Sequence, residues 1–227
     1  MPDKMYDKTG SELETTIINK SLDFARDRMK SLHASHGWDH VQRVIRNAEH
    51  IAATELQADA FIVRTAAILH DIARDEQDRA GGTLCHAELG SAEAEKFLLS
   101  EGLDPDRARH IARCILSHRY RKERKPESIE AMILYDADKL DSIGAIGIGR
   151  AFLFAGEVGA RLHNSEVDIS RTASYSEEDT AYREFMVKLR TVKDKMLTDE
   201  GRRLAQERHD FMIDYFRRLD EEVKGEL

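Results

Sequence analysis

The segment Arg64-Thr65-Ala66-Ala67-Ile68-Leu69-His70-Asp71-Ile72-Ala73 sets an imidazole and a carboxylate into a strongly apolar stretch. Apolar residues from Phe61 onward cover nearly every direction around a helix, which predicts a buried central helix ending near Arg74 or Asp75. Asp59 stands where an N-cap is expected, directly before this run. Because an unpaired buried carboxylate is strongly destabilising, the His-Asp pair needs a salt bridge, a hydrogen-bond network or a cation.

The composition describes an ordinary globular chain of 227 residues, 41% hydrophobic and 34% charged, with only three prolines. One large domain over residues 1–227, helical throughout, is expected. A net charge of −8 argues against a broad nucleic-acid-binding face, so no stable nucleic-acid complex is expected. Two cysteines, Cys85 and Cys114, form no disulfide framework or zinc motif, which favours the cytoplasm. No run approaches the roughly 18 apolar residues of a membrane span, so no membrane association is expected.

Helical periodicity predicts an all-α bundle of about eight to ten helices. The core is expected over about 30–160, with a C-terminal helical extension over about 176–222. Polar loops are expected at 75–83, at 119–126, which is basic, and at 163–176, which is long enough either to form a lid or to be simply disordered. The expected helical segments are about 11–30, 41–52, 60–74, 86–100, 105–118, 127–141, 143–159, 177–196 and 199–222.

Candidate metal ligands fall on three different predicted helices: His40, the pair His70-Asp71, and Asp138. Each alone has a structural alternative, as a capping histidine, a satisfied polar patch or a solvated carboxylate. Taken in order and with their flanking residues, they resemble the HD-domain metal-dependent phosphohydrolases, in particular the small stand-alone bacterial branch. The resemblance spans about 30–220, and its motifs are Asp39-His40-Val41-Gln42-Arg43-Val44, Leu69-His70-Asp71-Ile72 and Asp136-Ala137-Asp138-Lys139-Leu140-Asp141.

The resemblance implies that His40, His70, Asp71 and Asp138 bind one divalent cation. Two imidazoles and two carboxylates suit Mn²⁺, which we favour, with Fe²⁺, Ni²⁺, Co²⁺, Zn²⁺ and Mg²⁺ as alternatives. Four protein ligands leave about two octahedral positions for water and a phosphate oxygen. Such an ion activates water and polarises a phosphoryl group. Because Asp71 is one of the expected ligands of this ion, it is also expected to be a catalytic residue.

The downstream ligand has a rival. Helical phasing from Ile129, Ile133 and Leu140 places Asp136, and not Asp138, on the main apolar stripe. The family pattern selects Asp138, and the periodicity does not. Asp141 is expected to orient a ligand or to cap a turn.

Further residues are assigned by position. His118 is expected to contact phosphate or act as a general acid, with a core histidine as the alternative. His86 and His36 are expected to bind substrate, against the alternatives of a surface and a turn histidine. Lys139, which follows the proposed ligand, would bind substrate phosphate and neutralise charge in the transition state, with a solvated helix lysine as the alternative. Arg43 lies one turn after His40 and is expected to pair with a carboxylate near the site and to bind substrate.

The expected function is therefore that of a metal-dependent phosphohydrolase that acts on a nucleotide or a related phosphate ester or anhydride. A guanosine tetraphosphate-type or cyclic-nucleotide substrate is the enzymatic alternative. The alternative from another class is a non-catalytic metal-binding nucleotide sensor. The expected partner is a small phosphorylated substrate, and the oligomeric state, including a homodimer, is left open.

Overall fold

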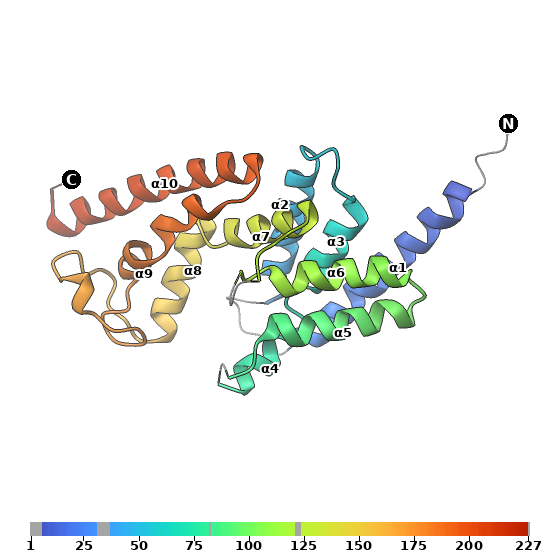
Figure 1. The fold of residues 1–227 in the computed structure, drawn as a ribbon. Helices are drawn as coiled ribbons and strands as arrows, with labels where there is room; N and C mark the ends of the chain where they lie inside the picture. Colours follow the sequence, from blue (N-terminus) through green and yellow to red (C-terminus); the bar gives the residue numbers. More distant parts are fainter. Residues whose placement is uncertain (1–5, 31–36, 82, 121–123, 227) are drawn as a thin grey trace. The chain divides into compact units, whose positions relative to one another are not determined.

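The computed structural model describes residues 6–30, 37–81, 83–120 and 124–226. The chain divides into two compact units, residues 1–137 and 138–227. In the described ranges it forms ten α-helices and two short 3₁₀-helices, with no strand (Figure 1). The predicted all-α fold is confirmed. The assignment of residues 1–227 to a single domain, with a core and a C-terminal extension, stays a prediction.

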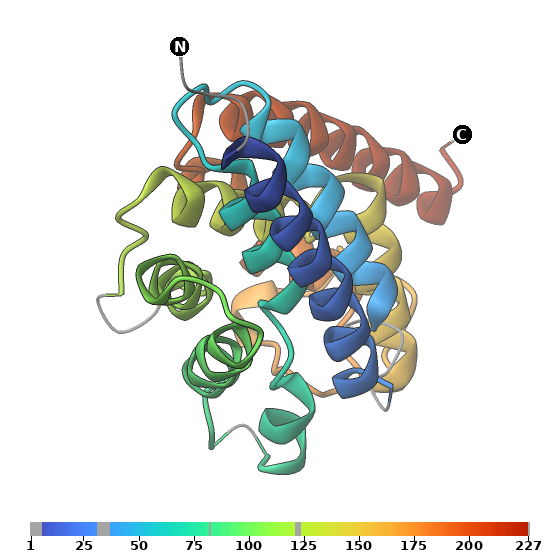
Figure 2. The ribbon, with the colours of Figure 1, turned by 90° about the vertical axis from the view of Figure 1, so that its right-hand side faces the viewer.

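The first unit contains the helices that carry most of the candidate site. α3 is buried on nearly all sides and packs against α1, α2 and α6, while α5 lies along α6 (Figures 1 and 2). α2 buries the stripe that begins at Val41, as its periodicity predicts. The helices are α1 (Tyr6–Arg28), α2 (Trp38–Ala52), α3 (Ala60–Leu69), α4 (Arg74–Arg79), α5 (His86–Ser100), α6 (Pro105–Ser117) and α7 (Ile129–Leu140), whose last three residues belong to the second unit.

The central helix begins as predicted but ends earlier. The Asp59 carboxylate accepts hydrogen bonds from the backbone N–H groups of Phe61 (2.9 Å) and Ile62 (3.2 Å), as an N-cap does. The predicted end near Arg74 is wrong, because α3 stops at Leu69. Beyond it the backbone makes i to i+3 bonds, such as the Arg74 N–H to the Asp71 carbonyl (3.0 Å). The His-Asp pair therefore lies in the turn at the end of the helix.

The expected polar loop at 75–83 contains a short helix, α4, that the sequence reading missed. It has no apolar stripe to signal it. Ion pairs one turn apart support it, from Arg74 to Asp78 (3.3 Å) and from Arg79 to Asp75 (2.5 Å). A polar helix of this length leaves no hydrophobic period to detect.

The second unit is built on α10, which packs against α8 and η2. The rings of Phe185 in α9 and Phe216 in α10 stack with centroids 4.6 Å apart. The expected single segment 177–196 is divided into a short α-helix and a 3₁₀-helix. The elements are α8 (Gly144–Glu157), η1 (Ile169–Arg171), α9 (Ala181–Val187), η2 (Leu189–Lys195) and α10 (Asp199–Lys224).

The 163–176 segment is tied to its own unit by buried and partly buried polar contacts. The amide of Asn164 donates to the Glu178 carbonyl (3.0 Å), and the Thr180 hydroxyl donates to the Asn164 side-chain oxygen (2.5 Å). Arg183 donates to the hydroxyl of Thr172 (2.6 Å). These bonds would have to break for the segment to move as a lid.

Helix α8 offers a stability test at two glycines. A Cβ at Gly147 would lie 2.3 Å from the Ser142 carbonyl oxygen, whereas one at Gly149 meets nothing within 4 Å. We expect Gly147→Ala to lower the free energy of unfolding by about 1–3 kcal/mol through this backbone clash. The matched Gly149→Ala should raise it by up to about 1 kcal/mol, since alanine favours a helix. Urea denaturation measures the free energy of unfolding of both variants. Equal changes in the two would refute the close approach of Gly147 to the Ser142 carbonyl.

Both cysteines are free thiols, and burial raises the pKa of the Cys114 thiol to about 12. The Cys114 thiol therefore stays protonated over the physiological range. None of the helices in the described ranges has the length and apolar character to cross a lipid bilayer.

Candidate metal centre

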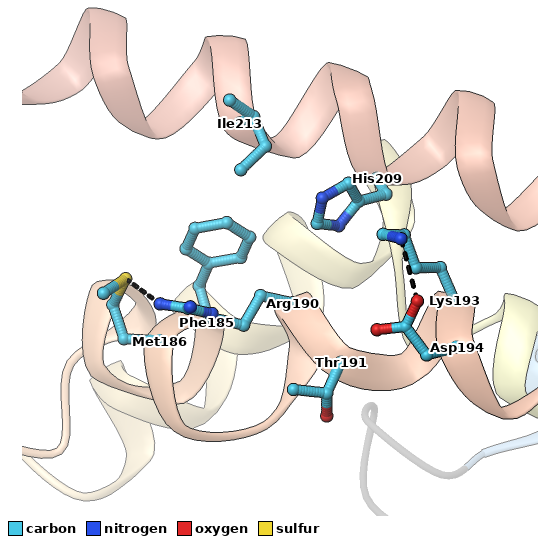
Figure 3. Close-up of a pocket in the computed structure, with 8 residues that line it drawn as sticks. All are labelled: Phe185, Met186, Arg190, Thr191, Lys193, Asp194, His209 and Ile213. Carbon is cyan, nitrogen blue, oxygen red and sulfur yellow. Dashed lines mark hydrogen bonds and ion pairs between the residues drawn. The ribbon is translucent and has the colours of Figure 1, made fainter.

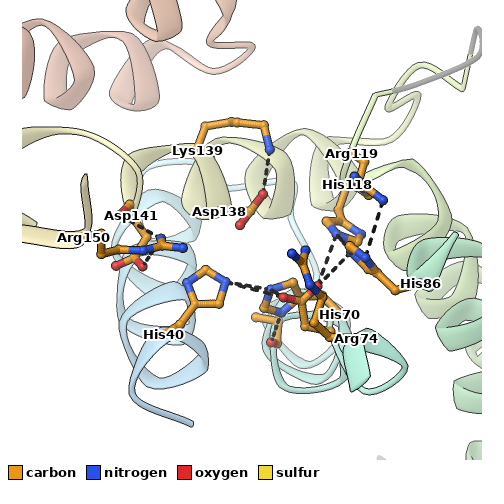
Figure 4. A network of polar contacts seen from close by, with 12 residues as sticks. His40, His70, Arg74, His86, His118, Arg119, Asp138, Lys139, Asp141 and Arg150 are labelled. Carbon is orange, nitrogen blue, oxygen red and sulfur yellow. Dashed lines mark hydrogen bonds and ion pairs between the residues drawn. The ribbon is translucent and has the colours of Figure 1, made fainter. Parts of the chain in front are cut away.

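Four histidine side chains lie close to the Asp71 carboxylate in the first unit. Figure 4 labels the four histidines. His40 comes from the first turn of α2, and His70 follows α3. His86 opens α5, and His118 follows α6. None of the four is more than 2% exposed, and Asp71 is 4% exposed. The starts of two helices and the ends of two others thus place titratable groups within one buried cluster.

The two carboxylate oxygens of Asp71 face different histidine pairs. Oδ2 lies 3.8 Å from Nε2 of His40 and 3.7 Å from Nε2 of His70. Oδ1 lies 3.0 Å from Nε2 of His86 and 3.6 Å from Nε2 of His118. Asp71 is therefore the one carboxylate among these five residues, and it lies between the two pairs.

Two of the histidines are oriented by the same local contact. Nδ1 of His70 lies 2.8 Å from the carbonyl oxygen of Ala67, and Nδ1 of His118 lies 2.6 Å from that of Ile115. A carbonyl only accepts, so Nδ1 must carry the proton in both rings. In the neutral form each ring then presents the lone pair of Nε2 to the cluster, as a metal-binding histidine does.

His86 is oriented by a side chain. Its Nδ1 lies 2.9 Å from the Oε1 atom of Gln77, which also accepts a bond from Arg119 Nη1 (2.8 Å). Because this oxygen accepts, Nδ1 of His86 donates and Nε2 again faces Asp71. The sequence reading missed Gln77, which lies in the polar segment assigned to a loop, and it placed Arg119 only in a basic run.

The short distance between the Nε2 atoms of His86 and His118 indicates a positive species between these two rings. Nε2 of His86 and Nε2 of His118 are 3.2 Å apart, and those of His40 and His70 are 3.3 Å apart. With Nδ1 protonated in His86 and His118, two neutral rings would bring two lone pairs face to face. A shared proton or a bound cation removes that repulsion.

The charge on Asp71 fits this arrangement. Burial by itself would raise the pKa of the Asp71 carboxyl. The imidazoles of His70, His86 and His118 outweigh that effect and hold the pKa well below its usual value. Asp71 is therefore an anion at neutral pH, which is the form that binds a cation.

The donor set suits a divalent metal. Ligand atoms of Asp71, His86 and His118 all lie within 4.8 Å of one another, and Nε2 of His40 and of His70 lie within 3.8 Å of Asp71 Oδ2. Imidazole nitrogen with carboxylate oxygen is a common combination for first-row transition metals. The Asp71 carboxylate and the histidines around it could thus hold a metal ion.

The other predicted residues of the first unit have different positions. Arg43 is half-buried on α2, one turn after His40. Asp136 is fully buried on α7, as the helical period predicts. His36 lies outside the described residues.

In the second unit, Lys139 pairs with Asp138, with Nζ 2.7 Å from Oδ2, and both side chains are partly exposed (Figure 4). Asp141 is 1% exposed and accepts a hydrogen bond from Arg150 Nη1 (2.8 Å). The same Arg150 atom donates to the Asp141 carbonyl (3.1 Å), so Asp141 orients Arg150 in the middle of α8.

A cavity of about 420 Å³ lies in the second unit between α10 and the α9–η2 segment (Figure 3). None of the predicted site residues lines it. Its Lys193 is already paired with Asp194 (2.8 Å). The lining residues are Phe185, Met186, Arg190, Thr191, Lys193, Asp194, His209 and Ile213.

A family model described as HD domain matches residues 37–143, a range that contains the whole histidine cluster. The chain belongs to the HD-domain family, as the resemblance of its motifs predicted. Its particular relatives include the uncharacterized protein YpgQ of Bacillus subtilis (strain 168), which is 38% identical over 196 residues, 85% of this chain and 86% of that protein.

Solved structures give the same assignment. Bacillus subtilis YpgQ in complex with ADP is 32% identical with a TM-score of 0.72, covering 92% of this chain and 96% of that one. A predicted HD superfamily hydrolase from an uncultured Thermotogales bacterium is 27% identical with a TM-score of 0.65, covering 90% and 92%. The chain therefore has the fold of the HD-superfamily hydrolases.

Proposed function

We propose that this protein is a metal-dependent phosphohydrolase whose substrate is a nucleotide. The observation that carries the proposal is the convergence of four buried imidazoles on the Asp71 carboxylate, inside the range matched by the HD-domain model. The nucleotide is supported by the ADP complex of YpgQ, at 32% identity over most of both chains. A cytoplasmic location and a homodimer stay predictions.

In this proposal His40, His70, Asp71 and Asp138 hold one divalent cation, with Mn²⁺ favoured. Asp138 is included because it occupies the last ligand position of the family pattern. It follows Ala137 in α7, and the Ala137 carbonyl accepts a bond from Asn47 of α2 (3.2 Å), two turns after His40. When bound, the ion lowers the pKa of water and polarises a phosphoryl group.

The remaining residues of the chain handle protons and charge. A proton held between Nε2 of His86 and Nε2 of His118 can pass to the leaving oxygen, so His118 serves as general acid or phosphate contact. Gln77 and Arg119 keep His86 in the orientation that this requires. Lys139 and Arg43 contribute positive charge toward the substrate phosphates.

A second cation is the alternative for the group formed by Asp71, His86 and His118, since it offers three ligand atoms. If the group holds a proton, we expect one Mn²⁺ per chain in the wild type and in His118→Ala, with kcat lowered about 10²–10³-fold in the variant. Metal counting by atomic spectroscopy after dialysis decides the matter. Two ions in the wild type and one in the variant would favour the second cation.

The test of function is a panel of nucleoside mono-, di- and triphosphates, guanosine tetraphosphate and cyclic nucleotides, each incubated with Mn²⁺, Co²⁺, Ni²⁺, Zn²⁺ or Mg²⁺. We expect metal-dependent release of phosphate or pyrophosphate from at least one compound. His70→Ala combined with Asp71→Ala should abolish that release. If nucleotides bind and none is cleaved, the protein is a metal-binding sensor and the hydrolase proposal is refuted.

A further inference from the structure

Tyr120 has a backbone conformation that aromatic residues rarely adopt. Its φ is +45°, in the left-handed region where a Cβ crowds the following carbonyl. Its N–H donates to the Ser117 carbonyl (2.9 Å) where the chain leaves α6. Such strained residues persist where the surrounding structure imposes them, and they cluster at functional sites.

Three other helices of this chain are followed by a glycine in the same left-handed conformation. Positive φ values follow α5 at Gly102 (+81°), α8 at Gly159 (+72°) and α10 at Gly225 (+70°). Glycine adopts this conformation without a steric penalty, which makes it the default residue at a helix C-terminus. The tyrosine after α6 therefore replaces the residue that the backbone would favour, so its side chain needs a reason of its own.

The ring of Tyr120 is held on one side and open on another. Its centroid lies 5.9 Å from that of Tyr135, with the planes at 72°, an edge-to-face contact. Tyr135 is 4% exposed, whereas Tyr120 is 42% exposed. The buried partner fixes the position of an aromatic surface that solvent still reaches.

The Tyr120 ring belongs to a residue that is close in sequence to the candidate metal centre. His118, two residues earlier, faces Asp71, and Arg119 donates to the Gln77 oxygen that orients His86. Two peptide units place the Tyr120 Cα within about 7.6 Å of the His118 Cα. If the phosphates of a nucleotide bound at the histidine cluster, the ribose would separate its base from the cluster.

We propose that the Tyr120 ring is the stacking platform for the base of the bound nucleotide. The proposal rests on the proposed function, since it adds a base-binding group to that site. Stacking on an aromatic ring tolerates different bases because every base has a π face. The ring would therefore recognise that a base is present, and not which base it is.

The test compares nucleotide binding with binding of the phosphates alone. Calorimetry with the Mn²⁺-loaded protein measures Kd for ADP, GDP and inorganic pyrophosphate, which lacks a base. We expect Tyr120→Ala to weaken ADP or GDP at least about 10-fold, or about 1.4 kcal/mol, and pyrophosphate less than about 2-fold. Tyr120→Phe should keep the affinity, since it keeps the ring.

Two further variants separate stacking from a structural role. Tyr120→Gly removes both ring and strain, so its melting temperature should not fall while its nucleotide affinity does. Tyr175→Ala is the control, because Tyr175 also has positive φ (+58°) and is 77% exposed, but belongs to the second unit. It should leave ADP and GDP binding unchanged.

The proposal is overturned if wild-type protein binds neither nucleotide more tightly than pyrophosphate, or if Tyr120→Ala weakens all three ligands equally. Those results would leave the hydrolase proposal intact, provided the substrate panel shows turnover. Tight nucleotide binding through Tyr120 without turnover would refute the hydrolase proposal alone.

Discussion

Asp71→Asn is expected to reduce kcat/KM at least about 10³-fold, or about 4 kcal/mol of transition-state stabilisation. The substitution keeps the volume of the side chain but removes the negative charge that lies 3.0–3.8 Å from the Nε2 atoms of four imidazoles. An amide is a poor ligand for a divalent cation, and its NH₂ group would displace the ion. Steady-state kinetics with Mn²⁺ on the best substrate of the panel measures the loss.

The control for this variant is Asp78→Asn, on the neighbouring helix α4. Asp78 is about half exposed and pairs along its own helix with Arg74 (3.3 Å). An exposed pair of this kind contributes little to stability, so activity and fold should be kept. Retention of more than a tenth of the activity in Asp71→Asn, in a folded protein, would contradict a catalytic role for the carboxylate.

His40→Ala is expected to weaken Mn²⁺ binding by more than about 10²-fold. Loss of a residue that merely orients a ligand costs about 10–100-fold, and loss of the ligand itself should exceed that. His40 is 2% exposed, and its Nε2 lies 3.3 Å from that of His70. The affinity is measured by titrating the metal-free protein with Mn²⁺ and monitoring the free ion by electron paramagnetic resonance.

His50→Ala is the matched control, since His50 lies on the exposed side of the same helix α2. Its Mn²⁺ affinity should equal that of the wild type. Equal weakening in both variants would indicate that damage to α2, and not loss of a ligand, explains the result.

Local sequence patterns predicted much of the first unit because they report which side of a helix is buried. Periodicity placed His40 on the margin of the α2 stripe and Asp136 inside α7, and the structure buries both. The cap at Asp59 was predictable because the free N–H groups at a helix start favour an aspartate at that position.

The meeting of side chains could not be predicted in this way. His86 begins a helix, a position that suggests a surface residue, yet it is buried because its ring packs against Asp71 and His118. Gln77 lies in a helix without an apolar stripe, and its role depends on residues nine and 42 positions away. Such contacts depend on how helices pack, which periodicity does not encode.

The choice between Asp136 and Asp138 has the same origin. Helical phasing identifies Asp136, which is buried, whereas only the order of the family motifs selects Asp138.

The most direct test of the central claim is anomalous diffraction from crystals of this protein grown with Mn²⁺. We predict a peak about 2.0–2.3 Å from Nε2 of His40, Nε2 of His70 and carboxylate oxygens of Asp71 and Asp138. A peak away from His40 and His70, or none at this cluster in a protein that needs Mn²⁺ for turnover, would contradict the account.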